Sequence, residues 1–252
     1  MWDMLRLVTI PISHYCEKAR WALERAGVSY REERHVQGIH RIYARRAGGG
    51  ATVPVLVAPG EVIASSGEIV AWADARLAPE QRLFAPGEDA SAGLCARFDD
   101  VLGPAGRRLM YVHMLEQRDV ALRYNNPGVP AWEGRAITTG WPLVQRFISR
   151  ALGIRPGVEH EDERTVFAEL DSVAALLGDG RAFLSGERFG AADLTFAAMA
   201  ASVVFPPSYG VRLPQPDELA PRTAALVERA REHPAGRHAL RMFSEHRHER
   251  VA

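Results

Sequence analysis

The chain has 252 residues, of which 47% are hydrophobic and 25% charged, so it is long enough to form two globular domains. Lysine plus arginine and aspartate plus glutamate each number 31, and this balance argues against nucleic acid or an anionic membrane surface as a partner. Only two cysteines, no run of 18 apolar residues and no signal-peptide pattern occur, which excludes a disulfide framework and predicts a soluble, cytoplasmic protein.

The first residues predict a βαβ unit. Residues 5–10 alternate in part and are rich in branched side chains, which is typical of a short strand. Apolar residues at helical spacing over residues 14–26, followed by Gly27, predict an amphipathic helix. Residues 29–36 predict a second strand, parallel to the first because a helical crossover joins them. Residues 38–50 predict an irregular helix and loop.

A hairpin and a helix are expected next. Apolar runs at residues 54–57 and 62–64 flank Pro59-Gly60, a turn sequence. Ser65 and Glu68 have the spacing of a capping box and predict the start of a helix. This order fits a thioredoxin-like α/β domain over residues 1–78, followed by a linker over residues 79–89 that contains Pro79, Pro86 and Gly87.

Residues 90–252 predict an all-helical domain. The candidate helices cover approximately residues 90–118, 137–153, 160–178, 190–204, 218–232 and 234–247. Gly103-Pro104 should kink or split the first of them. Loops are expected at residues 124–128 and 205–210.

The segment between the first strand and the first helix is a candidate anion site. Unpaired N–H groups at a helix N-terminus carry a partial positive charge. A thiol bound there and given a hydroxyl donor would lose its proton more easily. We expect Ser13 to supply that hydroxyl; the alternative is that Ser13 only caps the helix by accepting a hydrogen bond from the N–H of Cys16. His14 is expected to face solvent.

Two further positions are suited to a peptide ligand. Pro54 opens a strand, and although only about 5–6% of X-Pro bonds are cis, a cis bond here would turn the Val53 backbone outward to pair with a peptide. Ser65 and Ser66 bring two hydroxyls to a helix N-terminus, a natural carboxylate site. Capping explains Ser65 but not Ser66.

Three segments together resemble the glutathione-binding half of the glutathione transferases. They are Ser13-His14-Tyr15-Cys16 with Lys18 and Arg20, Thr52-Val53-Pro54-Val55-Leu56, and Ser65-Ser66 with Ile69. Residues 183–194 resemble the pattern with which that family starts a buried helix in its second domain. The resemblance spans residues 5 to about 245 and implies the glutathione transferase fold.

The resemblance implies a role for each matching position. Ser13 would stabilise the glutathione thiolate, with Tyr15 and Cys16 beside it. The glutathione-binding residues would be Tyr15, Cys16, Thr52, Val53, Pro54, Ser65 and Ser66. Val53 would pair with the cysteinyl part of glutathione, and Ser66, with help from Ser65, would bind the γ-glutamyl carboxylate. Many relatives carry glutamate at the position of Ser65 and lysine or glutamine at that of Thr52, so both departures remove a charge or a long donor. Asp193 would be the third residue of a buried helix that Gly190 caps.

The implied function is that of a cytosolic glutathione S-transferase of the serine type, which acts in detoxification as a homodimer. Glutathione would be a co-substrate, with no metal or nucleotide cofactor, and its thiolate would attack a small, apolar electrophile. Tyr111 and His113 are the expected wall of the electrophile pocket. Two alternatives stay open: a glutathione-dependent disulfide reductase or peroxidase that uses bound glutathione or Cys16, and a binding protein of this fold without turnover.

Overall fold

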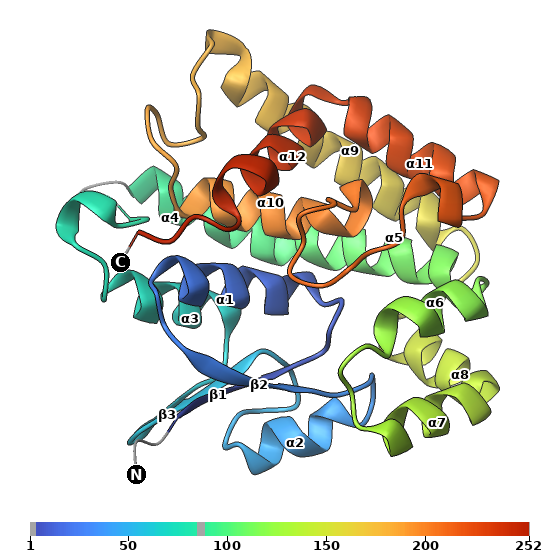
Figure 1. The fold of residues 1–252 in the computed structure, drawn as a ribbon. Helices are drawn as coiled ribbons and strands as arrows, with labels where there is room; N and C mark the ends of the chain where they lie inside the picture. Colours follow the sequence, from blue (N-terminus) through green and yellow to red (C-terminus); the bar gives the residue numbers. More distant parts are fainter. Residues whose placement is uncertain (1–3, 85–88, 252) are drawn as a thin grey trace.

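The computed structural model describes residues 4–84 and 89–251. The N-terminal part of the chain contains a four-stranded sheet (Figure 1). The strands are β1 (Leu5–Thr9), β2 (Tyr30–Arg34), β3 (Val55–Ala58) and β4 (Glu61–Ile63), in the order β2-β1-β3-β4. β1 is parallel to β2, whereas β3 is antiparallel to both β1 and β4. The predicted thioredoxin-like arrangement is therefore confirmed.

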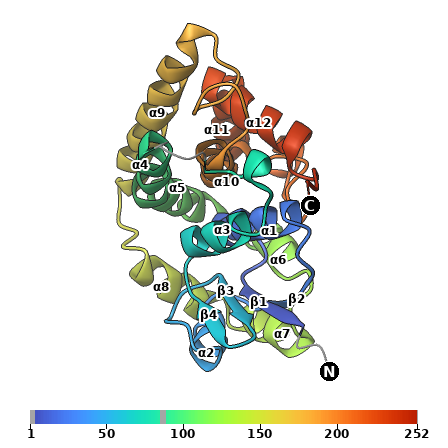
Figure 2. The same cartoon turned by 90° about the vertical axis from the view of Figure 1, so that its left-hand side faces the viewer.

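Helices cover both faces of this sheet (Figures 1 and 2). α1 (His14–Arg25) and α3 (Ser66–Asp74) lie together on one face, and α2 (His40–Arg46) lies on the other. Side chains alternate along β1, as the pleat of a strand requires. Leu7 accordingly belongs to the main hydrophobic core, whereas Val8 belongs to a smaller cluster under α2.

From Asp89 onward the described chain consists mainly of helices joined by loops and turns. The helices are α4 (Asp89–Arg97), α5 (Gly103–Leu115), α6 (Arg118–Asn125), α7 (Ala131–Thr139), α8 (Trp141–Ala151), α9 (Val158–Leu176), α10 (Ala191–Val204), α11 (Pro221–Glu232) and α12 (Pro234–His246). The predicted break at Gly103-Pro104 is confirmed, because a π-helical turn (Phe98–Leu102) joins α4 to α5 there. Pro86 and Gly87 of the expected linker lie outside the described residues. None of the helices in residues 4–84 and 89–251 combines the length and apolar composition needed to cross a lipid bilayer.

The sequence did not predict α6 and α7. Both are short, and neither has a side-chain cap bond to a described residue, so the usual signal for a helix start is missing. Gly140 separates α7 from α8, although the predicted helix over residues 137–153 ran through it. These helices lie beside α2 and below α5 in Figure 1.

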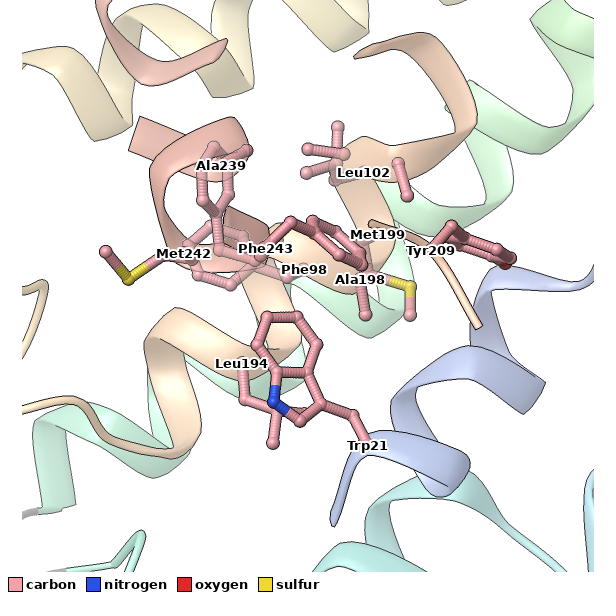
Figure 3. Close-up of a cluster of buried hydrophobic side chains, with 14 of the residues drawn as sticks. Trp21, Phe98, Leu102, Leu194, Ala198, Met199, Tyr209, Ala239, Met242 and Phe243 are labelled. Atoms are coloured by element: carbon pink, nitrogen blue, oxygen red, sulfur yellow. The ribbon is translucent and has the colours of Figure 1, made fainter. Parts of the chain in front are cut away.

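The main core joins the sheet domain to the helices (Figure 3). Trp21 of α1, which is completely buried, stacks on Phe189 and packs against the tilted ring of Phe243. α10 is buried around nearly its whole circumference, and its start matches the prediction: Asp193 Oδ2 accepts from the N–H of Gly190 at 3.2 Å. Asp193 Oδ1 accepts from the N–H of Leu184 and lies 3.0 Å from His238 Nε2. Because of these contacts, Asp193 is satisfied although it is fully buried.

A buried ion cluster centred on Glu17 ties α1 to distant segments. Glu17 Oε2 accepts from Arg20 Nε at 2.9 Å, and Glu17 Oε1 accepts from Arg247 Nε at 2.5 Å and from the N–H of Gly210 at 2.8 Å. Arg20 also reaches Glu32 of β2, with Nη1 and Oε1 2.7 Å apart. Burial alone would raise the pKa of Glu17, but Arg247 and Arg20 outweigh it, so the pKa is lowered and the carboxylate is charged.

We predict that Glu17→Gln lowers the free energy of unfolding by about 3 kcal/mol, because it removes the carboxylate between two buried guanidinium groups. Urea denaturation at pH 7 measures this. The folded pKa of Glu17 lies below its unfolded value, so this contribution is present above the unfolded pKa and is lost as pH falls through the folded pKa. The difference between variant and wild type should therefore shrink in acid.

Glu33→Gln is the control for this variant. Glu33 pairs with Arg6 at 3.1 Å on the partly exposed surface of the sheet, so its loss should cost less than about 1 kcal/mol. A Glu17→Gln protein as stable as the control variant would contradict the role of the buried cluster.

Candidate active site

A cavity of about 380 Å³ lies between the sheet domain and the helices. Its wall is formed by the start of α1, the segment from Gln37 to Arg41, the loop before β3, one face of α5, parts of α6, α7 and α8, and the segment that follows α10. Most of the lining side chains are apolar. Among the described residues that line it there are two arginines, Arg41 and Arg107, and no aspartate or glutamate.

Ser13 lines this cavity at the N-terminus of α1. Its Oγ accepts a hydrogen bond from the N–H of Cys16 at 3.4 Å, so Ser13 is the helix cap. A hydroxyl that accepts one bond still has its own hydrogen to donate. The capping role therefore leaves a donor at the helix N-terminus, where the helix dipole also favours an anion.

The side chains next to Ser13 are held neutral by burial. His14, expected to face solvent, is only 5% exposed; burial first and the charge of Arg107 second lower its pKa to about 3. The expectation was wrong because the start of α1 packs against α5, a contact that the local sequence does not reveal. Tyr15 lines the cavity, but its hydroxyl donates to the carbonyl of Asp99 at 2.7 Å, and burial raises its pKa to about 12.

Cys16 lies behind the cavity, within the core. Its side chain is fully buried and outside the lining, and burial raises the pKa of its thiol to about 11. Cys95 is also buried and free. Neither thiol is therefore placed or charged as a nucleophile would need to be.

The loop before β3 brings a second predicted segment to the cavity. The Val53-Pro54 peptide bond is cis. Thr52 and Val53 line the cavity together with Ser13, whereas Pro54 is buried beneath them. Two of the three predicted glutathione-binding segments therefore face one hollow.

The third segment lies outside the lining of this cavity. Ser65 is exposed, and its Oγ accepts from the N–H of Glu68 at 3.1 Å, which confirms the predicted cap of α3. Ser66 is 6% exposed. An ion pair between Lys18 and Asp99, 2.6 Å apart, lies next to Gly67 in the first turn of α3.

The predicted pair on α5 is divided between two environments. Tyr111 lines the cavity, and its hydroxyl accepts from Gln37 Nε2 at 2.9 Å. His113 is buried on the other side of α5, with Nδ1 3.1 Å from Thr223 Oγ1. Residues two apart on a helix do not share a face. Because Tyr111 faces the cavity, His113 faces away from it.

Other lining residues of α5 were missed by the sequence analysis. They are Arg107, Met110, Met114 and Leu115. Together with Tyr111 they recur every three or four residues, so the helical period starting from Tyr111 would have found them.

The cavity wall also contains a strained residue. Phe205 ends α10 with φ 44°, a left-handed conformation that a non-glycine residue adopts only under constraint. Arg231 holds it in place by donating to the carbonyls of Val204 and Phe205 at 2.8 and 2.6 Å.

Comparison with known proteins agrees with this architecture. Residues 7–81 match the family model of the glutathione S-transferase N-terminal domain. The structure is similar to a glutathione transferase from Phanerochaete chrysosporium over 100% of both chains, with a TM-score of 0.64 and 16% identity. The fold is that of the glutathione transferases.

Two other structures of this fold broaden the comparison. A glutathione S-transferase from Ceriporiopsis subvermispora, in complex with glutathione, has a TM-score of 0.62 and 17% identity over 97% of this chain and 98% of its own. A maleylacetoacetate isomerase from Anaeromyxobacter dehalogenans has a TM-score of 0.50 and 18% identity over 95% of this chain and 92% of its own. No curated protein matches the sequence. Residues 4–84 and 89–251 contain no group of three or more histidine, cysteine, aspartate or glutamate side chains that could hold a metal ion.

We predict that Cys16 resists alkylation in the folded protein. A thiol pKa raised from 9 to about 11 leaves about 100-fold less thiolate at neutral pH, and burial blocks access further. Labelling with iodoacetamide at pH 7.5, with and without guanidinium chloride, followed by mass spectrometry measures this. Rapid labelling of native Cys16 would contradict the structure and favour thiol-disulfide chemistry.

Proposed function

We propose that this protein is a glutathione S-transferase that joins the glutathione thiolate to a small electrophile. One observation carries the proposal: Ser13, at the N-terminus of α1, and Val53 face the same largely apolar cavity in a chain with the glutathione transferase fold. The structure that resembles it from Ceriporiopsis subvermispora holds glutathione, which supports the same ligand here. The resemblance of the sequence to this family also supports a cytoplasmic homodimer with a role in detoxification.

Glutathione fits the side of the cavity that the sheet domain forms. Val53 offers backbone groups to the cysteinyl part of the peptide. Arg41 and His40 of α2 line the same side, and the Arg41 guanidinium suits the glycyl carboxylate of a ligand whose net charge is negative. The γ-glutamyl end would then extend beyond the cavity toward Ser65 and Ser66 at the start of α3.

The proposed chemistry is nucleophilic substitution or addition by sulfur. The glutathione thiol loses its proton to solvent, and the Ser13 hydroxyl and the free N–H groups of α1 stabilise the thiolate. The sulfur lone pair forms a C–S bond with the electrophilic carbon. In a substitution, the bond from this carbon to the leaving group breaks, and the leaving group departs with the bonding pair. In an addition, the π bond at this carbon breaks, and its electron pair takes up a proton from solvent. Proximity within the cavity supplies the remaining acceleration.

The buried Cys16 argues against a disulfide reductase or peroxidase that uses Cys16 as its nucleophile. Such an enzyme needs an accessible thiolate, whereas this thiol is protonated and within the core. Two alternatives remain: a reductase or peroxidase that uses the thiol of bound glutathione, and a binding protein without turnover, which predicts glutathione affinity without conjugation.

We predict that Ser13→Ala lowers kcat for conjugation of 1-chloro-2,4-dinitrobenzene by about 100-fold, because one hydrogen-bond donor to the developing thiolate is lost. The absorbance of the dinitrophenyl thioether measures the rate. Ser13→Thr keeps a hydroxyl and a cap and should retain most of the activity.

Ser202→Ala is the matched control for Ser13→Ala. Ser202 also lines the cavity, but its hydroxyl donates to the carbonyl of Met199 at 2.9 Å, so its loss should leave kcat unchanged. Equal rates for Ser13→Ala and wild type would remove Ser13 from the mechanism. If calorimetry finds no heat of binding at millimolar glutathione, the whole proposal fails.

A further inference from the structure

Arg107 lies in the wall of an apolar cavity and, within residues 4–84 and 89–251, is a cation without a counterion. It projects from α5 and is partly buried. The described part of the chain gives its guanidinium neither a hydrogen bond nor a carboxylate within 4.0 Å, and its Nε is buried without a partner. The nearest aromatic contact is weak, since the guanidinium carbon lies 5.9 Å from the Tyr15 ring centroid.

Arg108, the next residue on α5, is paired with a carboxylate, as an arginine that stabilises the fold usually is. Arg108 binds both oxygens of Asp162, with nitrogen to oxygen distances of 2.7 Å. The buried arginines Arg20 and Arg247 likewise bind carboxylates. Removing a cation from water without a partner costs free energy, so Arg107 departs from the pattern that a stable fold favours. Such departures are expected where a ligand supplies the missing partner.

The groups around Arg107 leave its charge unneutralised. His14 carries no charge at neutral pH, since burial and Arg107 itself lower its pKa. The hydroxyl of Tyr15 donates to a backbone carbonyl, and that of Tyr111 accepts from Gln37. Since the described lining contains no aspartate or glutamate, an incoming acid group would meet no like charge there.

We propose that the second substrate is an organic anion with an apolar body, and that its carboxylate or sulfonate group binds Arg107. This rests on the proposed function and narrows it. Met110, Met114 and Leu115 follow Arg107 on the cavity face of α5 and provide the apolar surface for the body of the molecule. Arg41, on the opposite wall formed by α2, is left for the glycyl carboxylate of glutathione. Arg41 thus binds an acid group of glutathione, and Arg107 binds the acid group of the second substrate.

The test compares two electrophiles with the same reacting ring, the anion 4-chloro-3,5-dinitrobenzoate and its uncharged methyl ester. In both, the thiolate sulfur replaces chloride at the same carbon, so their intrinsic reactivity cancels when variant and wild type are compared. Arg107→Gln should lower kcat/KM for the benzoate by at least about 10-fold, because a charge-assisted hydrogen bond is lost. It should change kcat/KM for the ester by less than about 2-fold and leave the KM for glutathione unchanged.

Arg108→Gln is the matched control. It loses the pair with Asp162, so it should lower the melting temperature while leaving kcat/KM for both electrophiles as in wild type. Arg107→Gln, which loses no partner, should not lower the melting temperature. An equal loss for benzoate and ester, no loss for either, or a raised KM for glutathione would overturn the proposal.

A second measurement separates this proposal from the function on which it rests. Fluorescence titration without glutathione compares 8-anilinonaphthalene-1-sulfonate with N-phenyl-1-naphthylamine, the same body without the acid. Arg107→Gln should weaken binding of the sulfonate at least about 10-fold and leave the amine unaffected. If this holds while glutathione does not bind, the anion site stands and the transferase function fails. If glutathione is conjugated but Arg107→Gln binds the sulfonate like wild type, the transferase stands and the anion site fails.

Discussion

The arrangement of the cavity depends on one buried carboxylate, that of Glu17. It lies one turn into α1 and binds Arg20 on its own helix, Arg247 beyond the end of α12, and the backbone of Gly210. The N-terminus of α1 is therefore held in place relative to the segment after α10, and both border the cavity. Tyr209, next to Gly210, strengthens this link by donating to the carbonyl of Ile12, the residue before Ser13, at 3.1 Å. Opposite charges that are desolvated together fix geometry in a way that apolar contacts alone do not.

Uncharged side chains follow Ser13, whereas the charged side chains of the cavity wall are Arg41 and Arg107. Burial keeps His14 neutral and the Tyr15 and Cys16 side chains protonated, so none of the three residues after Ser13 carries charge at neutral pH. The fixed positive features are the N-terminus of α1, Arg41 and Arg107. In a cavity with few polar groups such charges act over a longer range than in water. Two substrates that each carry an acid group would be oriented by opposite walls, with the sulfur between them at Ser13.

Much of the fold, but less of the site, could be predicted from the sequence. The helix caps at Ser65 and Asp193 and the break at Gly103-Pro104 depend on residues within one or two turns, so local patterns reveal them. The placement of Ser13 and Val53 could be predicted because both belong to short segments typical of one fold. His113 shows the limit: its type suited a pocket, but its position, two residues from Tyr111, turned it toward Thr223. α6 and α7 escaped prediction because they lack capping side chains, and yet they contribute to the cavity wall.

Local sequence patterns are enough to predict the strands, most of the helices, the caps and the segment that presents Ser13, since each follows from propensity, period and hydrogen bonding among near neighbours. Which side chains of these segments are exposed depends instead on contacts with residues far away in the sequence. His14 is buried beside Gly103 and Arg107 of α5, Cys16 is buried within the core, and the bond from Arg247 to Glu17 joins residues 230 positions apart. Whether a charge is paired depends on such distant partners: Arg107 and Arg108 are the same residue type on the same helix, and only the folded chain gives Asp162 to one of them and a cavity to the other.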